Sequence, residues 1–186
     1  GQKGNISEQF ANTRDSLGGI VELISRGYQL SITHGNGPQV GNLLRQQEAG
    51  EKEGLAALPL GVLNAATEGT MGYMIEQSLQ NKLLQHGIKK QVITIVSQVV
   101  VDKNDSSMQN PTKYVGSTYY SAEQAEELKK SLGWTLKEDS GKGFRRVVPS
   151  PMPIEIIPAE TINELVHQGE IVIAVGGGGI PVYREA

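Results

Sequence analysis

The sequence contains no cysteine, few aromatic residues and no marked excess of charge of either sign. The absence of cysteine excludes a disulfide scaffold, a thiolate zinc site and a cysteine nucleophile. With 17 basic and 20 acidic residues, the chain has no positive field of the kind that binds nucleic acid. No apolar run approaches the ~18 residues of a membrane-spanning helix. We therefore expect a cytoplasmic protein with neither a nucleic-acid nor a membrane partner.

What the chain does contain is the composition of a globular protein. Hydrophobic residues make up 38% of its 186 residues, and 23 residues are glycine. Together these fall in the range of ~45–50% that is typical of folded domains, which excludes disorder of the whole chain. The length suits one domain with at most a small appendage.

The spacing of apolar residues predicts helices that alternate with strands. Helical periodicity covers residues 7–24, 39–47, 67–85 and 159–167, and β-branched or apolar runs cover residues 28–33, 91–101 and 171–175. Residues 48–59, charged and then rich in alanine, are predicted to form a loop. Alternation of this kind is typical of an α/β protein with a mostly parallel sheet between layers of helices.

Residues 102–153 interrupt this alternation. The segment is polar, holds four of the eight prolines, and carries one predicted helix at 122–131 and one strand at 144–148. Its aromatic residues could form a small core of their own: Tyr114, Tyr119, Tyr120, Trp134 and Phe144. We therefore predict a protruding lid subdomain, with residues 1–101 and 154–186 forming the main lobe.

Two glycine-rich turns each follow a predicted strand. Gly35, Asn36 and Gly37 precede a helix, and residues 176–179 are four consecutive glycines. Ligands of α/β sheets bind at the carboxyl ends of parallel strands, and free backbone N–H groups favour anions there. A plain turn that needs positive φ would explain the same residues, so the sequence leaves both interpretations open. The dinucleotide fingerprint is absent, because Val40 stands where it requires glycine.

Charged residues of the insertion are weaker candidates. Lys113 could place a mobile charge against a phosphoryl group, although a solvated surface lysine is the commoner case. Arg145 and Arg146 belong to the segment KEDSGKGFRR, which we interpret as a solvated hairpin rather than as a phosphate site. The three histidines lack the spacing of metal ligands, so no metal site is predicted.

Six segments, in order along the chain, resemble the carbamate kinases. They are HGNGPQVGNLL (34–44), TEGTMGYMIEQSLQNKL (67–83), QVVVDKNDSSMQNPTK (98–113), KEDSGKGFRRVVPSPMPIEI (137–156), ETINELV (160–166) and AVGGGGIPV (174–182). The resemblance implies the three-layer amino-acid-kinase fold and reversible phosphoryl transfer between ATP and carbamate, which gives ADP and carbamoyl phosphate in arginine catabolism. It also implies ATP or ADP with Mg²⁺, and a homodimer.

The resemblance assigns roles by position. Gly35, Asn36 and Gly37 would line the carbamoyl phosphate pocket, Gly176, Gly177 and Gly178 would face it, and the lid lysine Lys113 would reach the transferred group. The family also has an earlier phosphate-binding turn and a carboxyl-terminal nucleotide lobe that holds its metal ligand. We expect neither in these residues, so the fold is expected to be incomplete and the chain alone inactive. Tyr114 replaces a usual proline, which leaves the rigidity of the lid open.

Two alternatives remain at this point. The chain could belong to a non-catalytic carbamate-kinase-like protein that uses helix 67–85 for binding or dimerisation, through the apolar face formed by Met71, Met74, Leu79 and Leu83. It could also belong to another kinase of the same fold, acting on acetylglutamate, aspartate or a nucleoside monophosphate.

Overall fold

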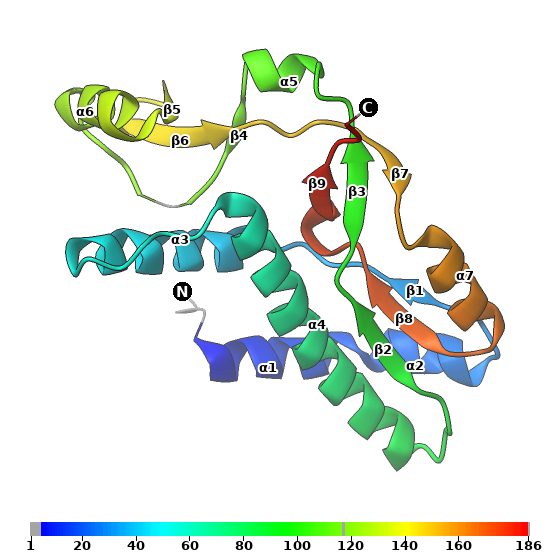
Figure 1. The fold of residues 1–186 in the computed structure, drawn as a ribbon. Helices are drawn as coiled ribbons and strands as arrows, with labels where there is room; N and C mark the ends of the chain where they lie inside the picture. Colours follow the sequence, from blue (N-terminus) through cyan, green and yellow to red (C-terminus); the bar gives the residue numbers. More distant parts are fainter. Residues whose placement is uncertain (1–4, 117, 186) are drawn as a thin grey trace. The chain divides into compact units, whose positions relative to one another are not determined.

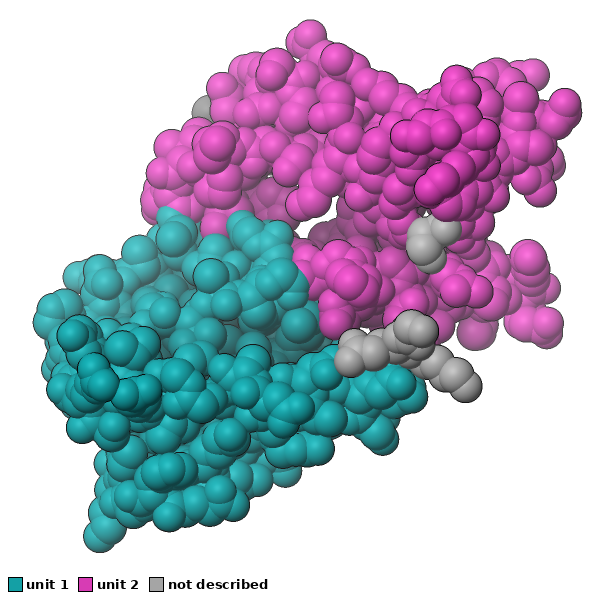
Figure 2. Space-filling view, turned by 180° about the vertical axis from the view of Figure 1, so that it is seen from behind, with its two compact units in different colours: residues 1–35, 65–98, 156–179 teal, residues 36–64, 99–155, 180–186 magenta. Residues whose placement is uncertain are grey.

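The computed structural model describes residues 5–116 and 118–185. The chain divides into two compact units, coloured separately in Figure 2. Unit 1 combines residues 1–35, 65–98 and 156–179, and unit 2 combines residues 36–64, 99–155 and 180–186. The predicted insertion at 102–153 lies entirely within unit 2. Its status as a separate lid subdomain stays a prediction.

A three-stranded parallel sheet forms the centre of unit 1 (Figure 1). Its central strand is β8 (Ile171–Ala174), with β1 (Ser31–Ile32) on one side and β2 (Val92–Ile95) on the other. Both neighbours run parallel to β8. Every residue of β8 is buried, which is typical of a strand covered on both faces. The predicted parallel sheet is therefore confirmed.

Helices cover the two faces of this sheet. On one face, α2 (Gly18–Ser25) and α4 (Leu60–Gln85) pack against Ile171 and Ile173 of β8. On the other face, α7 (Ala159–His167) packs Ile162 against Val172 and Ala174. Successive side chains of a strand point to opposite faces, so β8 contributes to both cores. Unit 1 thus has the helix–sheet–helix layering that was predicted.

One stripe of α4 caps the free edge of β2. Residues four apart lie on the same helix face, and three polar side chains in this stripe accept hydrogen bonds from backbone N–H groups of β2 and of the residues just after it. The pairs are Gln80 with the N–H of Val92 (3.1 Å), Glu76 with that of Thr94 (2.9 Å) and Glu68 with that of Ser97 (2.7 Å). Edge strands expose N–H groups that invite pairing with other chains, and this stripe satisfies them internally.

The remaining position of the stripe is Gly72. A Cβ atom there would lie 2.9 Å from Thr94 Oγ1 and well inside van der Waals contact of Thr94 Cγ2. Threonine is branched at Cβ and stiff about χ1, so it cannot easily move aside. The glycine is therefore what lets α4 approach β2 closely enough for its neighbours in the stripe to reach the strand.

We expect Gly72→Ala to lower the free energy of unfolding by about 1–3 kcal/mol, because the added methyl group overpacks the contact with Thr94. Gly69→Ala is the matched control. It lies on the same helix with open space around its Cβ position, and alanine is the better helix former by up to ~1 kcal/mol. Urea unfolding of both variants measures the difference. Equal effects at the two positions would contradict the close approach.

The structure corrects several predicted boundaries. The helix predicted at 7–24 is two helices, α1 (Ile6–Ser16) and α2, which meet at Leu17 before a pair of glycines. Glycine is a poor helix former. The strand predicted at 91–101 is two strands, β2 and β3 (Gln98–Val101), which belong to different sheets. They separate at Ser97, whose polar side chain is fully buried and bonds to backbone groups rather than continuing the sheet.

Helices extend further than the sequence pattern indicated. The helix that follows Asn36, α3 (Gly37–Lys52), continues through charged residues that were predicted as the start of a loop, and α4 begins at Leu60 rather than at residue 67. The residues that extend α3 are charged and mostly exposed, so apolar periodicity does not mark that extension. The strand predicted at 28–33 shrinks to the two residues of β1.

The described residues of unit 2 include α3, the start of α4 and the helices α5 (Ser106–Gln109) and α6 (Ala122–Leu132). Helix α6 begins at a capping box formed by Ser121 and Gln124 and ends at Gly133, which has a φ of 64°.

Two three-stranded sheets accompany these helices among the described residues. One has the order β7 (Pro153–Ile156), β3 and β9 (Ile180–Val182), and the other has the order β4 (Lys113–Tyr114), β6 (Phe144–Val148) and β5 (Thr135–Glu138). In the second sheet, the pairs of β6 with β4 and with β5 are both antiparallel.

Most secondary structure predicted for the insertion is confirmed. The helix at 122–131 is α6, and the strand at 144–148 is β6. Of the five aromatic residues predicted to form a small core, Tyr120 and Trp134 pack edge to face with ring centroids 6.4 Å apart, whereas Tyr114 and Tyr119 are exposed. Among the described residues, no helix combines the length and the apolar character that crossing a bilayer requires.

Candidate functional site

The first part of the candidate site lies in unit 1, where β1 and β8 end. Because these strands are parallel neighbours, the segments that follow them meet at one edge of the sheet. The N–H of Gly177 donates to the carbonyl of His34 at 2.8 Å, and the Thr33 hydroxyl donates to the carbonyl of Val175 at 3.0 Å. The structure thus brings the predicted turn Gly176–Gly178 beside the residue that precedes Gly35.

Glycine in this turn is required for two different reasons. A Cβ atom on Gly176 would lie 2.5 Å from Nε2 of His34 and 3.2 Å from Cγ of Glu68, so any larger residue there would have to displace the His34 side chain. Gly177, Gly178 and Gly179 have φ values of 65°, 95° and 82°, in the region that L side chains avoid. Val175 has a φ of 57°, a strained conformation for a β-branched residue.

Most N–H groups of the turn are already used. Besides the bond from Gly177 to His34, the N–H of Gly178 donates to the carbonyl of Val175 and that of Gly179 to the carbonyl of Gly176, both at 3.1 Å. The expectation of free consecutive N–H groups is therefore wrong for these three residues, because the segment winds into a short 3₁₀ turn. What the turn offers a ligand is a bare, closely approachable backbone surface.

A buried polar network holds Val175 in place. The Ser97 hydroxyl accepts a hydrogen bond from the N–H of Val175 at 3.0 Å and donates to the carbonyl of Ile95 at 2.8 Å. The N–H of Ser97 donates in turn to Glu68. Ser97 and Glu68 are 0% and 2% exposed. Sequence reasoning missed both residues. The available signal for Glu68 was its spacing, because it lies four residues before Gly72 and eight before Glu76, on the same face of the helix.

The second part of the candidate site lies in unit 2, at the start of α3. Asn36 is buried, and its side-chain amide donates to Oδ1 of Asn64, a partner that sequence reasoning missed. Its carbonyl accepts the N–H of Val40 at 2.9 Å and so begins the helix. Gly37 is the first residue of α3 and is exposed. Pro38 occupies the first turn, where its missing N–H costs nothing.

Lys113 lies on β4, opposite Val148 of β6. Its side chain is exposed, and within residues 5–116 and 118–185 no hydrogen bond or ion pair engages its ammonium group. Of the predicted site residues, unit 1 therefore holds Gly35 and the turn Gly176–Gly178, whereas unit 2 holds Asn36, Gly37 and Lys113. Their common role as a substrate site stays a prediction.

Tyr114 follows the lysine where the carbamate kinases usually have proline, and it is well held. Its hydroxyl donates to the carbonyl of Glu138 at 2.8 Å, and the Arg145 guanidinium lies 4.8 Å from the ring centroid. Its backbone also pairs with Val147 of β6. These contacts fix the start of β4 without the ring constraint of proline.

The two arginines of the insertion are engaged inside unit 2. Arg145 forms an ion pair with Asp139 at 2.7 Å and donates to the carbonyl of Gly116 at 2.7 Å. Its hydrogen bond holds the pKa of the Asp139 carboxyl below the usual range. Arg146 stacks over Trp134 at 4.2 Å, and burial lowers the pKa of its guanidinium. The predicted hairpin is confirmed as β5 and β6, although these arginines are half-buried rather than solvated.

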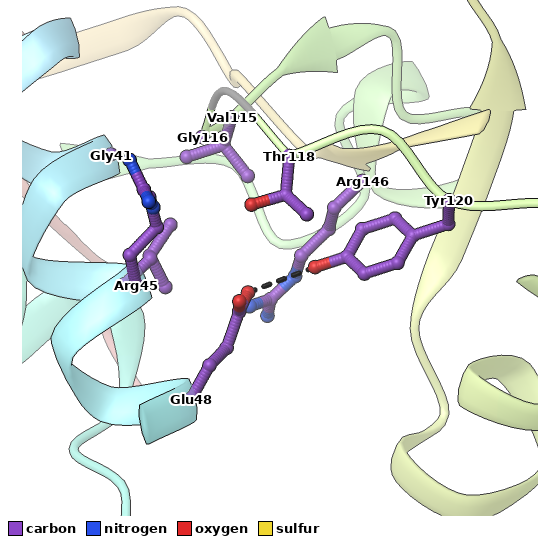
Figure 3. Close-up of a pocket in the computed structure, with 9 residues that line it drawn as sticks. Gly41, Arg45, Glu48, Val115, Gly116, Thr118, Tyr120 and Arg146 are labelled. Carbon is purple, nitrogen blue, oxygen red and sulfur yellow. Dashed lines mark hydrogen bonds between the residues drawn. The ribbon is translucent and has the colours of Figure 1, made fainter. Parts of the chain in front are cut away.

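A small cavity of about 10 Å³ lies in unit 2 between α3 and the residues Val115, Gly116, Thr118 and Tyr120 (Figure 3). It has room for about one water molecule, so it is too small for a substrate. Across it, the hydroxyl of Tyr120 donates to Oε1 of Glu48 at 2.9 Å. Burial, followed by this bond and the charge of Glu48, raises the pKa of Tyr120 to about 12. The contact ties the insertion to α3.

We expect Tyr120→Phe to lower the free energy of unfolding by roughly 1–2 kcal/mol, because it leaves the half-buried Glu48 carboxylate without this hydrogen bond. Amide hydrogen exchange in residues 115–120 should speed up as well. Tyr119→Phe is the control, since the Tyr119 hydroxyl bonds to Asp139 at an exposed site and at 3.2 Å. Slower or unchanged exchange in Tyr120→Phe would show that the contact does not hold this segment.

Among the described residues, no group of three or more histidine, aspartate or glutamate side chains could hold a metal ion. The acidic residues of the site do not provide a donor set either, because the carboxylate nearest the glycine turn, Glu68, is buried and bonded to Ser97. We assign no Mg²⁺ ligand to this part of the chain.

The sequence profile of the Amino acid kinase family matches residues 8–186, and the chain belongs to that family. Within it, the chain is similar to carbamate kinases. It is 52% identical to the carbamate kinase of Pyrococcus furiosus over 186 residues, which is 100% of this chain and 59% of that protein. It is 49% identical to a carbamate kinase-like protein of Escherichia coli, over 97% of this chain and 58% of that protein.

Solved structures agree with the sequence relatives. The carbamate kinase of Giardia lamblia bound to AMP-PNP superimposes with a TM-score of 0.90 at 36% identity, over 99% of this chain and 58% of that one. A crystal structure from Aeropyrum pernix gives a TM-score of 0.92 at 38% identity, over 100% and 60%. The resemblance found in the sequence is confirmed, and this chain spans about 59% of the length of the curated relatives it matches.

Proposed function

We propose that the protein to which this chain belongs is a carbamate kinase, which transfers a phosphoryl group reversibly between ATP and carbamate and gives ADP and carbamoyl phosphate. The observation that carries the proposal is the match of the whole chain, at about half identity, to proteins described as carbamate kinases. Use of ATP or ADP is supported by the relative that binds AMP-PNP. A cytoplasmic homodimer acting in arginine catabolism completes the proposal, on the strength of the resemblance.

The chemistry suits the residues of this chain. Phosphoryl transfer requires positioning and charge stabilisation more than covalent chemistry by the protein. Lys113 has an exposed ammonium group without a partner within the described ranges, so it is free to neutralise the transferred group. The bare backbone of the glycine turn in unit 1 suits the close approach of a small planar carbamoyl group. Mg²⁺, when bound with the nucleotide, would supply further charge neutralisation.

A lid over the site would protect the product. Carbamoyl phosphate hydrolyses readily, and closing segments exclude water from such intermediates. The insertion carries Lys113 on β4, a strand held by hydrogen bonds to β6. A rigid sheet that presents the lysine would move it toward or away from the reacting group as one body.

The alternative of a dimer seam on helix 67–85 is not supported. Leu79 and Leu83 of its apolar face are 0% exposed and pack in the core of unit 1 against Ile171 and Ile173. Met74 is also buried, whereas Met71 is half-buried. Leu79 and Leu83 hold the helix to its own sheet and are not available to a partner.

We further propose that the chain alone does not turn over, because it spans only part of its relatives and the resemblance assigns the nucleotide lobe to residues outside it. The test is ATP formation from ADP and carbamoyl phosphate by the isolated 186-residue chain, compared with the intact protein. No activity is expected from the chain alone. Measurable turnover would refute this part of the proposal, and the intact mass of the natural protein would show how much more it contains.

We expect Lys113→Met in the intact protein to lower kcat by about 10²–10³-fold, the effect seen when one group that stabilises transition-state charge is removed. Lys142→Met is the matched control, because Lys142 is an exposed lysine of the same insertion, in the turn between β5 and β6. Steady-state kinetics with carbamoyl phosphate and ADP measures both. Similar kinetics for the two variants would remove Lys113 from the mechanism.

A further inference from the structure

Glu68 is a buried carboxyl group with only half of its hydrogen-bonding capacity in use. It is 2% exposed, and Oε2 accepts the N–H of Ser97 at 2.7 Å. Oε1 is buried without a hydrogen-bond partner, and none of the ion pairs among the described residues includes Glu68. An ionised carboxylate is strongly disfavoured in such a place, whereas the neutral acid is tolerated.

The stripe on α4 provides an internal comparison. Gln80, Glu76 and Glu68 each accept a backbone N–H from the β2 edge or the residues just after it. Gln80 does so as a neutral amide, and Glu76 does so while partly exposed to water. Glu68 makes the same bond at the fully buried end of the stripe. The Glu68 carboxyl group accepts one N–H, as the amide oxygen of Gln80 does.

Glu68 also lies directly against the glycine turn of the candidate site. A Cβ atom on Gly176 would lie 3.2 Å from Cγ of Glu68 and 2.5 Å from Nε2 of His34. Through Ser97, the same side chain is linked to the strained residue Val175. A negative charge on Glu68 would therefore sit beneath the backbone that the proposed function offers to an anionic ligand.

We propose that Glu68 is a neutral carboxylic acid, with its proton on Oε1, that positions the glycine turn through Ser97 and keeps negative charge away from the anion received there. The effect on the anion rests on the proposed function, whereas the neutral state of Glu68 and its positioning role do not. Burial raises the pKa of the Glu68 carboxyl and outweighs the opposing effect of the Ser97 N–H.

The groups that the described contacts place around Glu68 are Ser97, Gly176 and His34. Of these, only the imidazole of His34 titrates, so its contribution has to be removed from any pH profile. His34→Gln removes the imidazole. It keeps the contact that shapes the glycine turn, because that contact is made by the backbone carbonyl of residue 34.

The first experiment is urea unfolding of the chain between pH 4.5 and 8.5 in the His34→Gln background, with and without Glu68→Gln. When a carboxyl group has a higher pKa in the folded chain than in the unfolded chain, the folded chain keeps the proton to a higher pH. Over that interval, rising pH lowers the free energy of unfolding. Relative to the midpoint of the Glu68→Gln chain, the urea midpoint of the chain with Glu68 should therefore fall as pH rises from 4.5 to 8.5.

Two further variants make this experiment specific. Glu76→Gln, at the partly exposed acceptor of the same stripe, is the matched amide control, and the fall of the midpoint relative to the Glu68→Gln chain should persist in it. Glu68→Leu leaves the Ser97 N–H without an acceptor and should lower the midpoint at every pH. Parallel midpoints with and without Glu68→Gln would overturn the inference. If Glu68→Gln does not fold, the ¹³C titration of the Glu68 carboxyl in the unsubstituted chain decides the same question, since an ordinary titration midpoint would refute it.

The second experiment uses sulfate, a dianion throughout this pH range, as a probe of the turn. In the His34→Gln background, sulfate affinity should fall several-fold as Glu68 ionises at high pH and should stay constant after Glu68→Gln. The same pH dependence in both chains would refute the effect of Glu68 on the anion. Absence of sulfate binding in every variant would instead count against the anion site of the proposed function, while the unfolding profiles still decide the state of Glu68.

Discussion

The structure of unit 1 depends on how α4 lies along the free edge of β2. An edge strand leaves a row of backbone N–H groups unpaired, and here one helix stripe supplies the acceptors: Gln80, Glu76 and Glu68. The helix must lie very close for these side chains to reach, which is why a glycine occupies position 72 of the same stripe. The need to pair the edge of β2 therefore determines how close α4 lies to the strand, which face it turns toward the strand, and which residues occupy that face.

The same requirement reaches the candidate site. Beyond the end of β2, Glu68 of the stripe accepts the N–H of Ser97. The Ser97 hydroxyl in turn accepts the N–H of Val175, which directly follows β8. Val175 keeps a left-handed backbone that its side chain disfavours, so the turn after it is held by neighbours rather than by its own preference. The glycine turn is thus positioned by the same hydrogen-bond network that pairs the edge of β2, through Glu68 and Ser97.

Sequence patterns predicted those elements whose signals are local. Helix α7 and strand β6 were predicted at their observed bounds, because apolar spacing and flanking glycine or proline mark them clearly. The break at Ser97 was missed, since its hydroxyl bonds to Ile95 and Val175 only in the folded chain. For the site, the position of both glycine turns was predictable, but the partners Glu68 and Asn64 were not. Tertiary contacts decide those roles, and a single sequence does not display them.

The bond between the Thr33 hydroxyl and the Val175 carbonyl joins residues 142 positions apart. Ser97, which meets the N–H of the same Val175, lies 78 positions away from it. Both bonds require segments that are far apart in the sequence to be brought together before they can form, which is entropically costly. The 3₁₀ hydrogen bonds of the glycine turn are local, but the position of the turn at the sheet edge therefore depends on the folding of unit 1 as a whole.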